Sequence, residues 1–257
     1  MSDPLAACSW PPLAPRHAAA IRDAVAFALA EVDAVGVVAA GTIVRGGAHA
    51  ASDLDLYVIH EAPFRRRVQR WFGERVPTEI FVNPPAAVRS YFAAEHERGR
   101  PATAHMLATG HVVLARHPVV EELRREAAAW LARPSPPSAS ALLRARYDAV
   151  TRFEDAADVA GEDPATAAML LARAVAAMLE TWCRARLGTI PRDKDLLARV
   201  TALDPQLGAA AREAFGEGRL SGRLAAAGWV AEHTVGARGF FEWDSGAEPV
   251  PGRPAST

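Results

Sequence analysis

Two stretches of alternating polar and apolar residues each carry acidic side chains. Asp53 and Asp55 open the stretch 53–60, and Glu79 lies in the stretch 78–83. Because residues two apart share one face of a β-strand, the two aspartates project together, about 7 Å apart along the chain. If the second stretch pairs beside the first, Glu79 lies about 5 Å to the side. The spacing therefore predicts three carboxylates along one edge of a sheet.

Such a group of carboxylates is unfavourable without a counter-cation, because each ionised carboxylate raises the pKa of the others. Mg²⁺ suits the group, since it prefers oxygen ligands, keeps several waters and is commonly completed by substrate phosphates. Two such ions about 4 Å apart could activate an attacking oxygen and stabilise a leaving one. The acids therefore indicate metal-assisted transfer of a phosphate-containing group.

A phosphate-binding turn is predicted just upstream of the acids. Gly41 and Thr42 directly follow the apolar run 35–40 and open a short helix. A glycine lets phosphate approach the backbone, and the N–H groups at a helix start favour anions. Arg45, one turn further on, adds a charge-assisted contact to a phosphate oxygen. Phosphate-binding and metal-binding residues thus lie on consecutive elements, as nucleotidyl transfer requires.

Residues 35–83 contain, in order, an apolar strand, Gly-Thr, Arg-Gly, Ser-Asp-x-Asp and a further acid one strand later. This pattern resembles the DNA polymerase β-like nucleotidyltransferase superfamily, especially its small bacterial members with a trailing helical domain. Those members include antibiotic nucleotidyltransferases and the minimal nucleotidyltransferases that are paired with helical HEPN domains. The joint spacing carries the resemblance, because an Asp-x-Asp pair alone is a weak signal.

The resemblance implies a role for each matching residue. Gly41 and Thr42 would lie at the triphosphate, and Thr42 keeps the hydroxyl of the commoner serine. Asp53 and Asp55 would be ligands to Mg²⁺, with two ions expected. Glu79 would be the third acid, able to hold the nucleophile-side metal or to act as a base.

Four further residues are candidates for ligand contacts. Arg45 supports the phosphate-binding turn, and Ser52, directly before the Asp-x-Asp pair, is grouped with the nucleotide-binding residues. His105 lies on a predicted short helix and could touch the base or the acceptor, although a structural histidine explains it as well. Lys194, the only lysine in the sequence, lies at a helix start, where it could contact substrate or simply cap the helix.

Two other features favour less specific roles. The arginines at 65–67 and Arg70 are predicted to begin a helix over 64–74 and to form a solvated face, with Trp71 beside them in the core. His233, the only histidine after residue 133, has no arginine four to six residues before it. The HEPN ribonuclease signature is therefore absent, which disfavours a toxin-like nuclease.

A proline- and serine-rich segment over 133–139 divides the chain near its middle. Before it, strand and helix patterns alternate, and after it long helical patterns dominate. The predicted fold class is α+β, with a small mixed-sheet nucleotidyltransferase domain over residues 1–133 and a helical bundle over 134–243. The proline- and glycine-rich residues 244–257 are expected to be disordered.

The composition is that of an ordinary globular protein. Of 257 residues, 50% are hydrophobic and 23% charged, and the formal net charge is −1, which excludes a disordered chain and a strongly basic nucleic-acid binder. Cys8 and Cys183 form neither a metal-type pair nor a disulfide framework, which favours a cytoplasmic location. Glu31 and Asp33 interrupt the longest apolar stretch, 24–44, and no secretory signal pattern is present, so we expect no membrane partner.

These features predict an enzyme that moves a nucleoside monophosphate from a nucleoside triphosphate to a hydroxyl group. ATP is the default donor by family habit, and the expected acceptor is a small molecule such as an aminoglycoside-like antibiotic. One alternative is a protein-modifying nucleotidyltransferase that acts as an antitoxin, and another is a catalytically silent nucleotide-binding module. Nucleic acid is not expected as a partner. The sequence leaves the acceptor, the donor base and the oligomeric state open, whether a homodimer or a complex with a partner protein.

Overall fold

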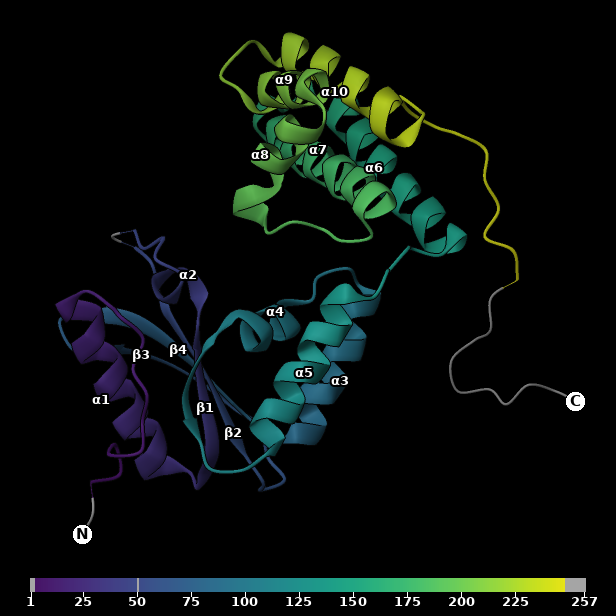
Figure 1. The fold of residues 1–257 in the computed structure, drawn as a ribbon. Helices are drawn as coiled ribbons and strands as arrows, with labels where there is room; N and C mark the ends of the chain where they lie inside the picture. The colour runs from purple at the N-terminus through teal and green to yellow at the C-terminus, as the bar shows by residue number, and fades with distance from the viewer. Residues whose placement is uncertain (1–2, 50, 248–257) are drawn as a thin grey trace, which may run out of the picture. The chain divides into compact units, whose positions relative to one another are not determined.

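The chain forms two compact units, Met1–Arg133 and Pro134–Thr257. The computed structural model describes residues 3–49 and 51–247 (Figure 1). Of the tail predicted to be disordered, residues 248–257 lie outside the described residues, and residues 244–247 have no regular secondary structure.

A mixed five-stranded sheet forms the centre of the first unit, as the sequence predicts. The strands follow the spatial order β3-β4-β2-β1-β5, in which β2 and β4 are parallel and the other neighbours antiparallel. Their bounds are Ala34–Ala40 for β1, Leu54–His60 for β2, Arg66–Phe72 for β3, Val76–Asn83 for β4 and His111–Ala115 for β5.

Helices cover both faces of this sheet (Figure 1). One face packs against α1, and the other packs against α3, α4 and α5, while α2 follows β1 directly. The bounds are Pro15–Glu31 for α1, Gly41–Val44 for α2, Pro85–Glu97 for α3, Ala102–Thr109 for α4 and Val119–Ala132 for α5.

The alternation in β2 explains how the strand serves both layers. Leu54 and Leu56 belong to the apolar cluster on the α1 side, whereas Tyr57 and Ile59 belong to the cluster on the side of α3, α4 and α5. Asp55 shares the face of Tyr57, because residues two apart project together. Asp55 is only half-buried, whereas Tyr57 and Ile59 on the same face are buried in the core. The start of β2 therefore presents a polar side chain at the edge of this apolar face.

The predicted helix over 64–74 is wrong, because this segment forms β3. The strand runs antiparallel to β4, and the turn that joins the two contains Gly73 with φ +52° and Arg75 with φ +55°. Backbone pairing with β4 is a non-local interaction that local helical spacing does not reveal. Trp71, predicted to lie in the core, is 60% exposed.

The second unit is a bundle of helices, in agreement with the prediction. The bounds are Ala139–Asp158 for α6, Pro164–Leu187 for α7, Asp193–Leu203 for α8, Pro205–Phe215 for α9 and Leu220–Val235 for α10. Among the described residues, α7 is the one helix that is long and apolar enough to cross a membrane, and half of its most apolar window is buried within the protein. Leu171 and Met178 place α7 in the core of the bundle, which explains its apolar sequence.

Candidate metal and nucleotide site

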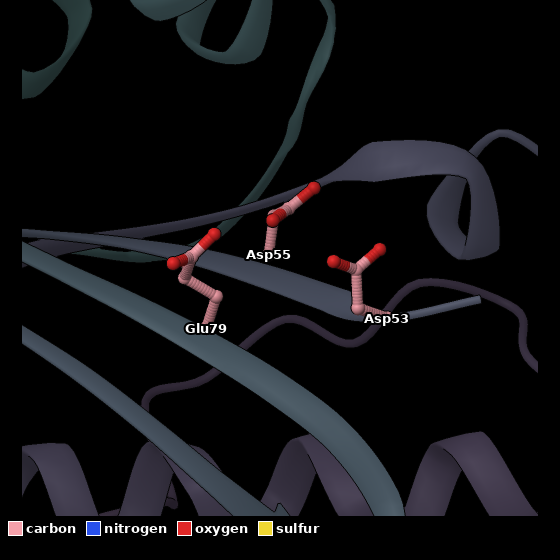
Figure 2. Close-up of side chains that lie close together, drawn as sticks. All are labelled: Asp53, Asp55 and Glu79. Carbon is pink, nitrogen blue, oxygen red and sulfur yellow. The ribbon is translucent and has the colours of Figure 1, made fainter. Parts of the chain in front are cut away.

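The three predicted acids converge. Asp55 on β2 lies directly opposite Glu79 on β4 in the parallel register, and Asp53 immediately precedes β2. One oxygen from each carboxylate lies within 4.8 Å of the others. Figure 2 shows the three carboxylates raised from the same side of the strands. Asp53 is exposed, whereas Asp55 and Glu79 are half-buried, so solvent reaches the group from the Asp53 side.

The register of the sheet sets two of these acids, Asp55 and Glu79, in a row that crosses four strands. Ala40, the last residue of β1, pairs with Asp55, which pairs with Glu79, which pairs with Gln69 on β3. The turn that begins at Gly41 therefore lies at one end of the row and β3 at the other. The site therefore has a glycine turn on the side of β1 and polar side chains on the side of β3.

Gly41 lies against Asp55, the acid on β2. Its φ is +86°, a region that residues with a side chain rarely adopt, and a Cβ added there would lie 2.5 Å from Asp55 Oδ2. Only glycine allows the backbone to begin α2 this close to the carboxylate. The sequence predicts a phosphate-binding position at Gly41 and a metal ligand at Asp55. The structure places these two residues in contact.

The turn after Gly41 is compact. Gly47 N–H donates to the Thr42 carbonyl at 3.0 Å, and the backbone N–H of Arg45 closes the short helix α2. The side chain of Arg45 is exposed, so it is available to a ligand from solvent. Ser52 supports the loop before the acids, since its hydroxyl accepts a 2.8 Å hydrogen bond from the backbone N–H of His49.

Two functional contacts escape the sequence prediction because they come from β3. Arg67 Nε donates to Glu79 Oε1 at 2.5 Å, and Gln69 Nε2 donates to the same oxygen at 2.9 Å. This contact with Glu79 raises the pKa of Arg67. The guanidinium supplies part of the counter-charge that the sequence assigned to metal alone, and both bonds leave Glu79 Oε2 for another partner. Alternation of Arg67 and Gln69 in a strand was the signal that could have revealed them.

The donor set fits a divalent ion that prefers oxygen ligands. Two Mg²⁺–oxygen bonds of about 2.1 Å span at most about 4.2 Å, so ligand atoms within 4.8 Å of one another need only small side-chain rotations to share an ion. Asp53, Asp55 and Glu79 are the residues that would hold it, and the open Asp53 side leaves room for waters or phosphate oxygens.

The remaining candidates lie on other elements. His105 is exposed on α4 and is not among the residues grouped with the acids. Lys194 is exposed on α8 of the second unit, which is a separate compact body. His233 Nε2 lies 2.9 Å from Asp204 Oδ2 and stacks on Trp229, which is a structural contact within the bundle.

Comparisons with known proteins agree with this geometry at the level of the fold. No protein-family model matches the chain, and no curated protein matches it significantly. Among solved structures, it is similar to a nucleotidyltransferase-like protein from Exiguobacterium sibiricum 255-15. The match covers 84% of this chain and 73% of that one, with a TM-score of 0.50 and 13% identity. The chain thus has a nucleotidyltransferase-like fold of mixed sheet and C-terminal helices.

Proposed function

We propose that the protein is a magnesium-dependent nucleotidyltransferase that moves a nucleoside monophosphate from a nucleoside triphosphate, by default ATP, to a hydroxyl group of a small acceptor. The joint placement of the three acids beside Gly41 carries this proposal. Adjacent carboxylates destabilise a fold through repulsion, so they need a reason beyond architecture. A metal-bound triphosphate supplies that reason and also uses the close approach at Gly41.

In the proposed reaction, the acceptor oxygen forms a bond to the α-phosphorus and the bond from that phosphorus to the leaving pyrophosphate breaks. Asp53 and Asp55 hold the divalent ions, while the backbone at Gly41 and Thr42 binds the triphosphate. Glu79 takes the proton of the acceptor hydroxyl at Oε2, because Arg67 and Gln69 occupy Oε1. When bound, the divalent ions would make the acceptor oxygen more nucleophilic and stabilise the leaving one. Positioning and charge stabilisation account for most of the acceleration in such reactions.

Removal of one aspartate charge tests the proposal. Mg²⁺ and ATP together should raise the melting temperature of the wild-type protein, since saturation to about 100 times Kd stabilises the folded state by about 2.7 kcal/mol. Asp53→Asn and Asp55→Asn should each lose this magnesium-dependent rise. Their metal-free melting temperature should stay equal or increase, because repulsion between carboxylates is relieved.

Asp23→Asn is the matched control, since Asp23 is an exposed acid on α1, the helix on the opposite face of the sheet. This variant should respond to Mg²⁺ and ATP like the wild type. A full magnesium-dependent response in both Asp53→Asn and Asp55→Asn would contradict the proposed roles of these residues.

A further inference from the structure

A cavity of about 640 Å³ opens on the sheet face that carries the acids. Tyr57 and Phe81 line it, and each lies two residues beyond an acid, Asp55 on β2 and Glu79 on β4. The cavity therefore lies further along β2 and β4 from Asp55 and Glu79, within the first unit alone. Its volume is in the range of small-molecule sites, about 300–1,000 Å³.

The charged groups around this cavity are mostly cationic. The lining contains Arg65, Arg66 and Arg67 but one acid, Glu95. The carboxylate of Glu95 accepts hydrogen bonds from Thr103 N–H at 2.7 Å and from Thr103 Oγ1 at 2.8 Å. Glu95 is thus used to hold the start of α4, and an anionic ligand would meet guanidinium groups instead.

Arg65 is the cation best placed to bind a ligand. It donates to the phenol oxygen of Tyr91 at 2.9 Å and lies 5.8 Å from the centre of that ring. By contrast, Arg66 pairs with Glu31 and Arg67 pairs with Glu79. The Tyr91 hydroxyl is neutral, so the charge of Arg65 is not balanced by a carboxylate in this contact.

The floor of the cavity is aromatic with one buried amide. The rings of Tyr57 and Phe81 are stacked at 5.9 Å, and the Arg67 guanidinium lies 5.0 Å from the centre of the Phe81 ring. Asn83 is 5% exposed and donates from Nδ2 to the Tyr57 hydroxyl at 3.2 Å. Tyr57 is 1% exposed, so the half-buried Phe81 supplies the accessible aromatic surface. Such a surface beside a fixed amide suits a planar ligand body with a polar edge.

The position of the cavity relative to Asp55 and Glu79 decides which substrate would use it. In an in-line displacement, the attacking and leaving oxygens lie on opposite sides of the phosphorus. If the triphosphate lies at Gly41, the attacking oxygen approaches from the Glu79 side, and the cavity lies along β4 from Glu79. Acceptor and cavity then fall on the same side.

We propose that this cavity is the acceptor subsite and that it selects an acceptor with a planar body and a negatively charged group, bound by Arg65 in the first unit. This inference rests on the proposed function and names its acceptor class. It disfavours the aminoglycoside-like acceptor expected from the sequence, because a polycation would be repelled by the arginines. The planar body lies over Phe81, and the reacting hydroxyl points toward Glu79.

Three matched probes test the charge preference directly. The probes 4-(hydroxymethyl)benzoate, 4-methylbenzyl alcohol and 4-(aminomethyl)benzyl alcohol share a ring and a hydroxymethyl group but carry negative, neutral and positive charge. Binding is measured by ligand-observed NMR titration on the full chain, without nucleotide and with a chelator. The anionic probe should bind with Kd on the order of 1 mM, as expected for so small a ligand, and the cationic probe should bind at least roughly tenfold more weakly.

Arg65→Gln should weaken the anionic probe about tenfold, the loss expected for one charge-assisted contact. Arg70→Gln is the matched control, since Arg70 lies on β3, which begins directly after Arg65, but stacks on Phe27 of α1 at the other face. That variant should leave binding unchanged. The inference would be overturned if the three probes bound equally well or if the cationic probe bound best. It would also be overturned if the anionic probe did not bind at a concentration about ten times the expected Kd, or if the two variants had equal effects.

The same samples separate this inference from the proposed function. Probe binding needs neither metal nor nucleotide, so it should persist in Asp53→Asn. If the magnesium-dependent response to ATP is present and the probes fail, only the acceptor assignment is wrong. If the probes behave as expected and the response to ATP is absent, the nucleotidyl-transfer proposal is wrong.

Discussion

Gly41→Ala is the substitution whose consequence the structure defines most closely. The new Cβ would lie 2.5 Å from Asp55 Oδ2, and Gly41 has φ +86°. Gly46 provides a matched comparison in the same turn, because its φ is +81° but an added Cβ meets nothing within 4 Å. Both variants carry the same kind of backbone strain, and only one of them collides with a proposed metal ligand.

The two variants should therefore differ in function more than in stability. An alanine in the left-handed region costs about 1–2 kcal/mol, so both variants should lose roughly that much free energy of unfolding. The collision at Gly41 involves the far end of the Asp55 side chain, which can rotate away. To reach an ordinary contact distance of about 3.5 Å, the carboxylate oxygen must move by about 1 Å. A misplacement of about 1 Å can cost on the order of 100-fold in a site that depends on geometry.

Urea denaturation and titration with Mg²⁺ and ATP distinguish these effects. Gly46→Ala should retain the affinity of the wild type for the magnesium–nucleotide complex, whereas Gly41→Ala should lose on the order of 100-fold. In an Asp55→Ala background the collision is absent, so Gly41→Ala should then have the same stability cost as Gly46→Ala. Equal loss of nucleotide affinity in the two glycine variants would show that the contact with Asp55 does not matter for binding, as would full affinity in Gly41→Ala.

Three further predictions concern the surroundings of the site and the bundle. Arg67→Met should increase the affinity for Mg²⁺ in a thermal-shift titration, because Glu79 loses a cation that competes with the metal. The control Arg70→Met should leave this affinity unchanged. Lower Mg²⁺ affinity in Arg67→Met alone would contradict this competition. Thr103→Val should lower the free energy of unfolding, measured in urea, by about 1–2 kcal/mol, because the half-buried Glu95 loses a hydrogen-bond donor. A change below about 0.5 kcal/mol would show that this hydrogen bond does not stabilise the fold. Asp204 accepts hydrogen bonds at the start of α9, which hold its pKa below the usual 3.8. That stabilisation is present above pH about 3.8 and is lost as the pH falls through the depressed pKa, so acid unfolding of Asp204→Asn, followed by circular dichroism, should lack this component; an unchanged pH profile would contradict the assignment.

The sequence predicts the three acids because their placement follows from local rules. Alternation fixes the face of Asp55, and one pairing between two short strands fixes the distance to Glu79. The direct contact between Gly41 and Asp55 follows from the antiparallel register of β1 and β2, since the residue before Gly41 pairs with Asp55. Short-range geometry and two strand pairings are sufficient for this part of the site.

The rest of the site depends on tertiary interactions that local patterns do not encode. The strand β3 lies at the edge of the sheet and is rich in exposed arginine, so it lacks the apolar alternation that identifies a half-buried strand. Arg67 and Gln69 were missed for that reason. The cavity was missed because it needs α3, α4 and three strands assembled around it. Its lining residues are widely separated in the sequence, and no spacing motif joins them.

The location of a bound divalent ion decides whether Asp53, Asp55 and Glu79 form a metal site beside Gly41. Crystals grown with Mn²⁺ and a non-hydrolysable nucleoside triphosphate analogue should give an anomalous peak between Asp53, Asp55 and Glu79, with the phosphates toward Gly41. Strong Mn²⁺ peaks at other positions only, or phosphates bound away from Gly41, would contradict the account.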